Sequence, residues 1–166
     1  IYEKTSSYSV FVRRFLNPYK PPYISVKVTD SLLTQLEDDY FTSIEKADTF
    51  VKSRGGIFYH FLQPNFFMIP KLTDYEKKLL KNGYLIPPPL ENVYHKGYPR
   101  LRMAVARASK LGIFSFDISG AFDQRKSEIF LDFCHVNEKG NELLAKEIFR
   151  TILKNSRTFS AKGDTL

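Results

Sequence analysis

Residues 55–64 read GGIFYHFLQP, and this stretch decides which class of fold the chain can adopt. The run from Ile57 to Leu62 is apolar and aromatic and too short for a helix, so it predicts a buried strand. Two glycines separate it from a preceding helical pattern, and Pro64 ends it. A second run of this kind, Ile113–Ile118, predicts a second buried strand. Such strands between helical segments indicate an α/β fold with a parallel sheet.

Four helices are predicted around these strands: from Ser31, as N-cap, to Lys52; from a capping box at Thr73–Glu76 to Asn82; from Pro99 to Gly112; and from Asn137 to Lys154. Residues 8–16 predict a further short helix, Pro87–Pro89 an extended surface loop, and residues 155–166 a loose tail. Two parallel strands are too few to cover several long helices. We therefore expect sheet strands upstream of this chain.

Composition limits the possible functions. The chain has 166 residues, of which 43% are hydrophobic, and this favours one folded domain. Its net charge is +7, but the basic residues are scattered in twos and threes, as in Arg13–Arg14 and Lys77–Lys78. No motif for nucleic-acid binding occurs, so a generally basic, solvated surface is favoured over a nucleic-acid partner.

Targeting signals are also lacking in the printed sequence. No run approaches the roughly 18 apolar residues of a membrane span. The first residues, Ile1–Lys4, are not the start of a signal peptide. If a signal lies upstream, a cell-envelope or secreted location is expected, and a cytoplasmic one otherwise.

The most informative segment for chemistry is residues 132–141, DFCHVNEKGN. Asp132 and His135 are three residues apart on a loop that enters a helix, so both side chains can lie on one face. The carboxylate can then reach Nδ1 of the imidazole and leave Nε2 as a base, the arrangement that activates a serine hydroxyl. Spacing alone also fits a structural alternative without catalysis, in which Asp132 caps the helix and His135 is merely exposed.

This block resembles the last motif of the SGNH (GDSL-type) serine hydrolases, which supplies their catalytic Asp and His. Residues 61–65 (FLQPN), residues 72–76 (LTDYE) and the segment from Ile113 to Asp132 are similar to other parts of one bacterial branch. The resemblance covers roughly residues 31–154. It implies a flavodoxin-like three-layer α/β/α fold in which His135 is the general base and Asp132 orients it.

The other motifs of that family are missing. They are a Gly-Asp-Ser block after the first strand, a glycine block, and a Gly-x-Asn-Asp block. Residues 163–165 (GDT) follow no apolar strand, and Ser6, Ser7 and Ser9 lack that context too. We therefore expect residues 1–154 to be the C-terminal part of one such domain, incomplete at its N-terminal strands, with the serine outside this chain.

Other reactive side chains have simpler interpretations. His60 lies within a predicted strand and His95 in a loop, so a packed and a solvated histidine are favoured. Cys134 is expected to be a packed thiol, because its neighbour's imidazole should point elsewhere in the turn. Gln63 is as compatible with a cleft as with a loop-stabilising role. The three histidines share no ligand spacing with a carboxylate cluster, and neither a metal nor a cofactor is expected.

The sequence thus predicts the C-terminal part of a serine esterase that acts on an acylated carbohydrate, a lipid or a small ester. An O-acyltransferase of the same fold is an open alternative, because hydrolysis and transfer share an acyl-enzyme. So is a non-catalytic basic binding module, since fold alone does not fix function.

Overall fold

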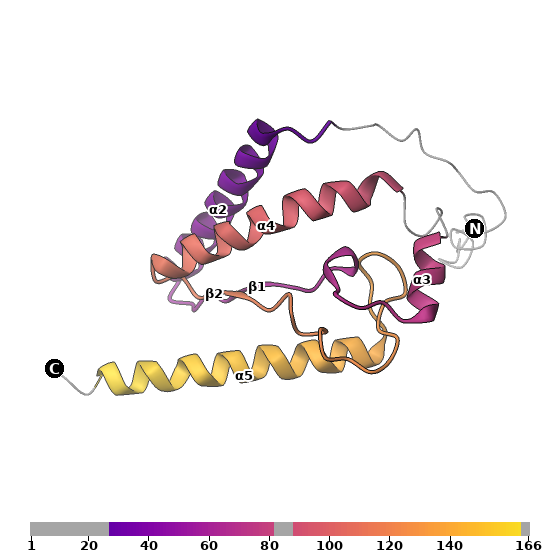
Figure 1. Ribbon diagram of the computed structural model, residues 1–166. Coiled ribbons are helices and arrows are strands. Elements are labelled where there is room, and N and C mark those ends of the chain that lie inside the picture. The colour runs from indigo at the N-terminus through magenta and orange to yellow at the C-terminus, as the bar shows by residue number, and fades with distance from the viewer. Residues whose placement is uncertain (1–26, 82–87, 164–166) are drawn as a thin grey trace, which may run out of the picture.

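The computed structural model describes residues 27–81 and 88–163 of the chain, and the expectations for residues 8–16 and for Pro87 lie outside them. Its elements are α2 (Asp30–Lys52), β1 (His60–Leu62), the 3-10 helix η1 (Phe66–Met68), α3 (Asp74–Lys81), α4 (Pro88–Lys110), β2 (Ser115–Asp117) and α5 (Glu138–Gly163). Figure 1 shows α2 and α4 on one side of the two strands and α5 on the other. The mixed α/β class is therefore confirmed.

The two strands pair in parallel, as the sequence predicts. His60 lies opposite Ser115, Phe61 opposite Phe116, and Leu62 opposite Asp117. Both strands are shorter than predicted, because pairing starts only where the His60 N–H donates to the carbonyl of Phe114, at 2.8 Å. The prediction that the first strand starts at Ile57 is wrong, and this side chain is 68% exposed.

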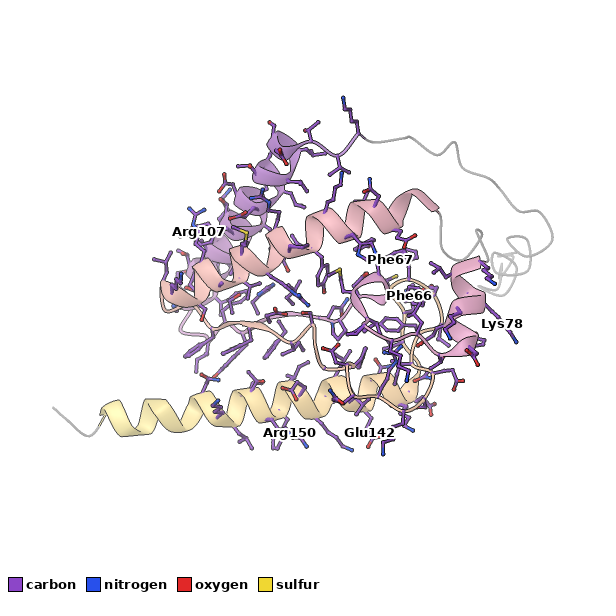
Figure 2. The ribbon with its side chains drawn as sticks, in the orientation of Figure 1. Phe66, Phe67, Lys78, Arg107, Glu142 and Arg150 are labelled. Atoms are coloured by element: carbon purple, nitrogen blue, oxygen red, sulfur yellow. The ribbon has the colours of Figure 1, made fainter. Side chains whose placement is uncertain are left out.

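The two faces of this small sheet differ in chemistry. Leu62 and Ile113 pack toward α2 and α4 in a core with Phe41, Ile44 and Val105. The alternate positions carry aromatic rings on the opposite face, because strand side chains alternate between faces. There Phe61 stacks on Phe116 with ring centroids 5.5 Å apart, and Tyr59 on Phe114 at 5.0 Å. In Figure 2, Glu142 and Arg150 of α5 point away from the strands.

The helix boundaries correct several predictions. Thr29, not Ser31, caps α2, since its Oγ1 accepts the N–H of Leu32. Pro99 lies inside α4 instead of starting it. Pro88 is the first residue of that helix, where a missing N–H costs nothing, so the predicted proline loop is helical at residues 88 and 89. The end near Gly112 is confirmed, with φ of 79° at this glycine.

The last helix extends further than predicted. It runs to Gly163, so the expectation that it ends at Lys154 is wrong. No proline or glycine interrupts the sequence between these two positions. The side-chain amide of Asn155 donates to the carbonyl of Thr151, at 2.7 Å, and so joins the preceding turn instead of ending the helix. Within the described ranges, no helix has the length and apolarity needed to cross a membrane.

A second core positions the loop that carries Asp132 and His135. It joins η1, α3 and the segment before α5 through side chains with almost no solvent contact: Phe66, Phe67, Leu79, Phe122, Ile129 and Phe130. Phe130 meets Phe66 edge to face at 5.5 Å and Phe122 at 5.6 Å. Figure 2 shows Phe66 and Phe67 between α4 and the first turns of α5. The buried ring of Phe130 therefore anchors the start of the loop.

Candidate active site

A narrow backbone loop holds the two residues of the predicted catalytic pair. Phe130 and Val136 form an antiparallel bridge. The N–H of Leu131 donates to the carbonyl of His135 at 2.9 Å, and the N–H of Asn137 donates to that of Ile129 at 2.8 Å. These bonds close the loop at its base, so its tip at residues 132–135 has few conformations available.

Asn137 connects this loop to α5 and explains part of the motif's spacing. Its Oδ1 accepts the N–H of Gly140 at 3.0 Å, so it caps the helix that begins one residue later. Its amide nitrogen donates to the carbonyl of Glu128 at 2.9 Å. One side chain thus joins the helix start to the strand-like segment before Asp132.

Gly140 is required by close packing. A Cβ atom added there would lie 2.6 Å from Cγ2 of Ile129 and 2.7 Å from Cβ of Val136, both in the walls of the loop. We predict that Gly140→Ala lowers the free energy of unfolding by about 1–3 kcal/mol, measured by denaturant titration. Lys139→Ala, at an exposed position of the same turn, is the control and should change it by less than about 0.5 kcal/mol. Equal stability of the two variants would contradict the packing described.

Glu76 fixes the segment just before the loop. The predicted capping box is confirmed: Oε2 of Glu76 accepts the N–H of Thr73 at 2.9 Å, and Oγ1 of Thr73 accepts the N–H of Glu76 at 3.3 Å. Oε1 accepts the N–H groups of Ile129 and Phe130, at 3.3 and 3.5 Å. The carboxylate also pairs with Arg125 at 2.5 Å, and both side chains are buried. A helix cap on α3 therefore also holds the backbone leading to Asp132.

Asp132 and His135 meet as their spacing predicts. Oδ2 of Asp132 lies 2.6 Å from Nδ1 of His135. Oδ1 accepts the N–H groups of Cys134 at 2.8 Å and His135 at 2.7 Å, which fixes the carboxylate to the backbone of its own loop. The imidazole is 73% exposed, so the pair faces outward from the loop.

The charge state of Asp132 follows from these contacts. Partial burial raises the pKa of its carboxyl, but the two backbone N–H groups and the imidazole outweigh burial and lower the pKa below its usual value. Asp132 is therefore ionised at neutral pH and can only accept. Nδ1 of the imidazole must then be the donor in the 2.6 Å hydrogen bond, which leaves the lone pair of Nε2 available as a base.

No family model, curated protein or solved structure matches this chain. These comparisons therefore add nothing to the functional interpretation, which depends on the residues of this chain and their geometry.

Cys134 differs from its prediction in one respect. The thiol is half-buried, but its sulfur lies 3.5 Å from Nδ1 of His135, so the imidazole does not point away from it. Burial and the nearby charge of Asp132 raise the pKa of the thiol, which keeps it protonated. Because the thiolate is the reactive form, Cys134 is a poor nucleophile at neutral pH.

These three side chains also form a set of metal-ligand atoms that sequence spacing did not predict. A carboxylate oxygen, a sulfur and a ring nitrogen from Asp132, Cys134 and His135 lie within 4.8 Å of one another. The carboxylate and the imidazole already share a 2.6 Å hydrogen bond.

The other histidines are not part of this site. His60 is half-buried, with Nε2 3.0 Å from the hydroxyl of Tyr40 and Nδ1 2.8 Å from that of Ser115. Burial lowers the pKa of His60, so the ring is neutral near pH 7 and has a structural role. His95 is half-exposed, 3.7 Å from Glu91, as expected for a solvated histidine. The prediction that it lies in a loop is wrong, because α4 runs through this position.

Sequence reasoning missed one residue that supports the loop. Asn65 is buried, its Oδ1 accepts the N–H of Phe67 at 3.0 Å, and its amide nitrogen donates to the carbonyl of Phe133 at 3.4 Å. It thus links η1 to the tip of the loop. The signal available was its position directly after Pro64, at the carboxyl end of a strand, where α/β proteins often place their sites.

Proposed function

We propose that this chain carries the general base and its orienting carboxylate for acyl transfer from an ester, in a serine hydrolase of the SGNH type. The observation that supports this most strongly is the 2.6 Å contact between Oδ2 of Asp132 and Nδ1 of His135. Within the described residues, nothing is hydrogen-bonded to Nε2 of His135. Nε2 is therefore available to take the proton of a hydroxyl group outside the described residues.

The proposed reaction uses a serine that lies upstream, in a longer polypeptide. Its hydroxyl oxygen attacks the ester carbonyl carbon while Nε2 of His135 takes the hydroxyl proton. The carbon–oxygen bond to the alcohol then breaks, and His135 returns the proton to the departing alcohol. Water repeats the sequence on the acyl-serine and releases the acid. Asp132 stays ionised throughout and stabilises the imidazolium.

Two features of the structure support the proposal. A merely capping Asp132 would need only its bonds to backbone N–H groups, and Asn137 already caps α5. The arrangement of helices on both sides of a parallel pair is compatible with a three-layer α/β/α domain whose further strands lie upstream. Hydrolysis is proposed here; an acyltransferase would use the same pair with another acceptor.

The first test uses the chain alone. We predict that residues 1–166 hydrolyse p-nitrophenyl acetate no faster than the same chain with His135→Ala, because an imidazole without its serine has no positioned nucleophile to activate. Release of p-nitrophenol, followed by absorbance, gives both rates. If the unaltered chain turned over repeatedly and His135→Ala did not, the nucleophile would lie within this chain and its placement upstream would be wrong.

A further inference from the structure

A cavity lies next to the candidate pair, at the carboxyl end of β1. Its volume is about 280 Å³, and its walls come from α2, α4, the segment after β1 and the loop with the pair. Ligands of open parallel sheets bind outside the carboxyl ends of the strands, so the position is typical of a binding site. The volume lies near the lower limit of ligand pockets, about 300 Å³, which indicates a small ligand.

Cys134 connects this cavity to the catalytic pair. It lines the cavity, and its sulfur lies 3.5 Å from Nδ1 of His135. A group bound against Cys134 is therefore within a few ångströms of the imidazole. No other residue of the loop tip lines the cavity, so its contents are adjacent to the pair without covering it.

Four of the nine residues that line the cavity are aromatic. Tyr40 comes from α2, Phe61 from β1, and Tyr94 and Tyr98 from α4. Tyr94 is held in place by Phe67, with the rings stacked at 5.2 Å between centroids. Ring faces favour apolar or planar groups.

Some polar groups of the wall bond to the protein itself. The hydroxyl of Tyr40 bonds His60 at 3.0 Å, and that of Tyr98 donates to the carbonyl of Gln63. The amide nitrogen and oxygen of Asn65 bond backbone atoms of Phe133 and Phe67. Gln63 and Tyr94 also line the cavity, so a ligand meets their polar groups beside the aromatic rings.

We propose that the cavity binds the acyl side of the ester, as a short aliphatic or single-ring aromatic acyl group. The assignment of the cavity as an acyl pocket rests on the proposed function. The small volume disfavours a long fatty-acyl chain. Of the three substrate classes expected from the sequence, the acyl part of a small ester or of an acylated carbohydrate fits best.

The only cysteine of the chain provides the test, because Cys134 lines the cavity. Alkylation by iodoacetamide is run at alkaline pH, because the raised pKa of the thiol keeps it protonated near neutrality. Mass spectrometry follows the rate, and Cys134→Ser confirms the position. Neutral acyl probes, benzamide and butyramide, should slow alkylation about threefold at twice their dissociation constants. Methyl glucoside should leave the rate unchanged, and octanamide should protect no better than butyramide.

A matched pair of variants locates the protection. Tyr94→Ala removes a wall and should abolish protection by benzamide, whereas Tyr75→Ala, at a half-exposed position on α3 outside the cavity, should not. Because Tyr94→Ala could also disturb folding, saturation-transfer NMR on the unaltered chain gives a second measurement. The benzamide signal should be present in the free protein and lost once Cys134 is alkylated.

Each other outcome contradicts the proposal in a defined way. Equal protection by methyl glucoside would indicate a carbohydrate site, and stronger protection by octanamide a longer channel. If neither benzamide nor butyramide protected Cys134, the cavity would not be a binding site for such acyl groups. These results do not depend on esterase activity: protection without activity in the longer polypeptide would contradict the proposed function alone.

Discussion

Replacing Glu76 by alanine is expected to lower the free energy of unfolding by about 3–5 kcal/mol, because it leaves the buried charge of Arg125 without a partner. It also removes the acceptor for the N–H groups of Thr73, Ile129 and Phe130. Denaturant unfolding measures the loss. Asp74→Ala removes an exposed ion pair with Lys77 on the same helix and should cost far less stability than Glu76→Ala.

The same carboxylate should make stability depend on pH. Burial raises the pKa of Glu76, but the Thr73 N–H, Arg125 and the Ile129 N–H together hold it below its ordinary value of 4.5. A pKa lowered by folding contributes stability above the unfolded value, and this contribution is lost as pH falls through the folded value. Glu76→Gln should therefore lose less stability than the unaltered chain on acidification from pH 4.5. If the two curves stayed parallel, folding would not lower the pKa of Glu76.

The largest effect on activity is expected at the pair itself. In the proposed longer polypeptide with an upstream serine, His135→Ala should lower kcat/KM for p-nitrophenyl acetate by about 10²–10⁴, the usual contribution of a general base. Asp132→Asn should lower kcat/KM too, since a neutral amide cannot stabilise the imidazolium of His135 as the ionised carboxylate does. The double variant should be no worse than the worse single one, because the two residues act as a unit.

Glu142→Gln provides the control for these kinetics. Glu142 is an exposed carboxylate on α5 whose partner is Lys146, and it lies outside the site. Its replacement should leave kcat/KM unchanged. Full activity in His135→Ala would exclude His135 as the base, whereas full activity in Asp132→Asn alone would exclude only the orienting role.

The sequence predicted best those features that depend on a few neighbouring residues. The capping box at Thr73–Glu76 and the approach of Asp132 to His135 each need only a three-residue spacing, and both are present. The parallel pairing of the two aromatic strands followed from their apolar character and the helices between them. In each case local chemistry and tertiary packing favour the same geometry.

Features that depend on distant residues were predicted poorly. The second oxygen of Glu76 bonds residues 53 and 54 positions away, and no local pattern indicates this. Pro99 was expected to start a helix, yet α4 continues through it, and buried neighbours such as Tyr98, Ala104 and Val105 show that packing outweighs the missing hydrogen bond. The aromatic cavity was missed because its rings come from three separate elements.

The most direct test of the central claim is fluorophosphonate labelling of the longer polypeptide, followed by peptide mass spectrometry. The account predicts one labelled serine, upstream of Ile1, with labelling strongly slowed by His135→Ala and unchanged by Glu142→Gln. Labelling of a residue within the 166-residue chain, or labelling that does not depend on His135, would contradict it.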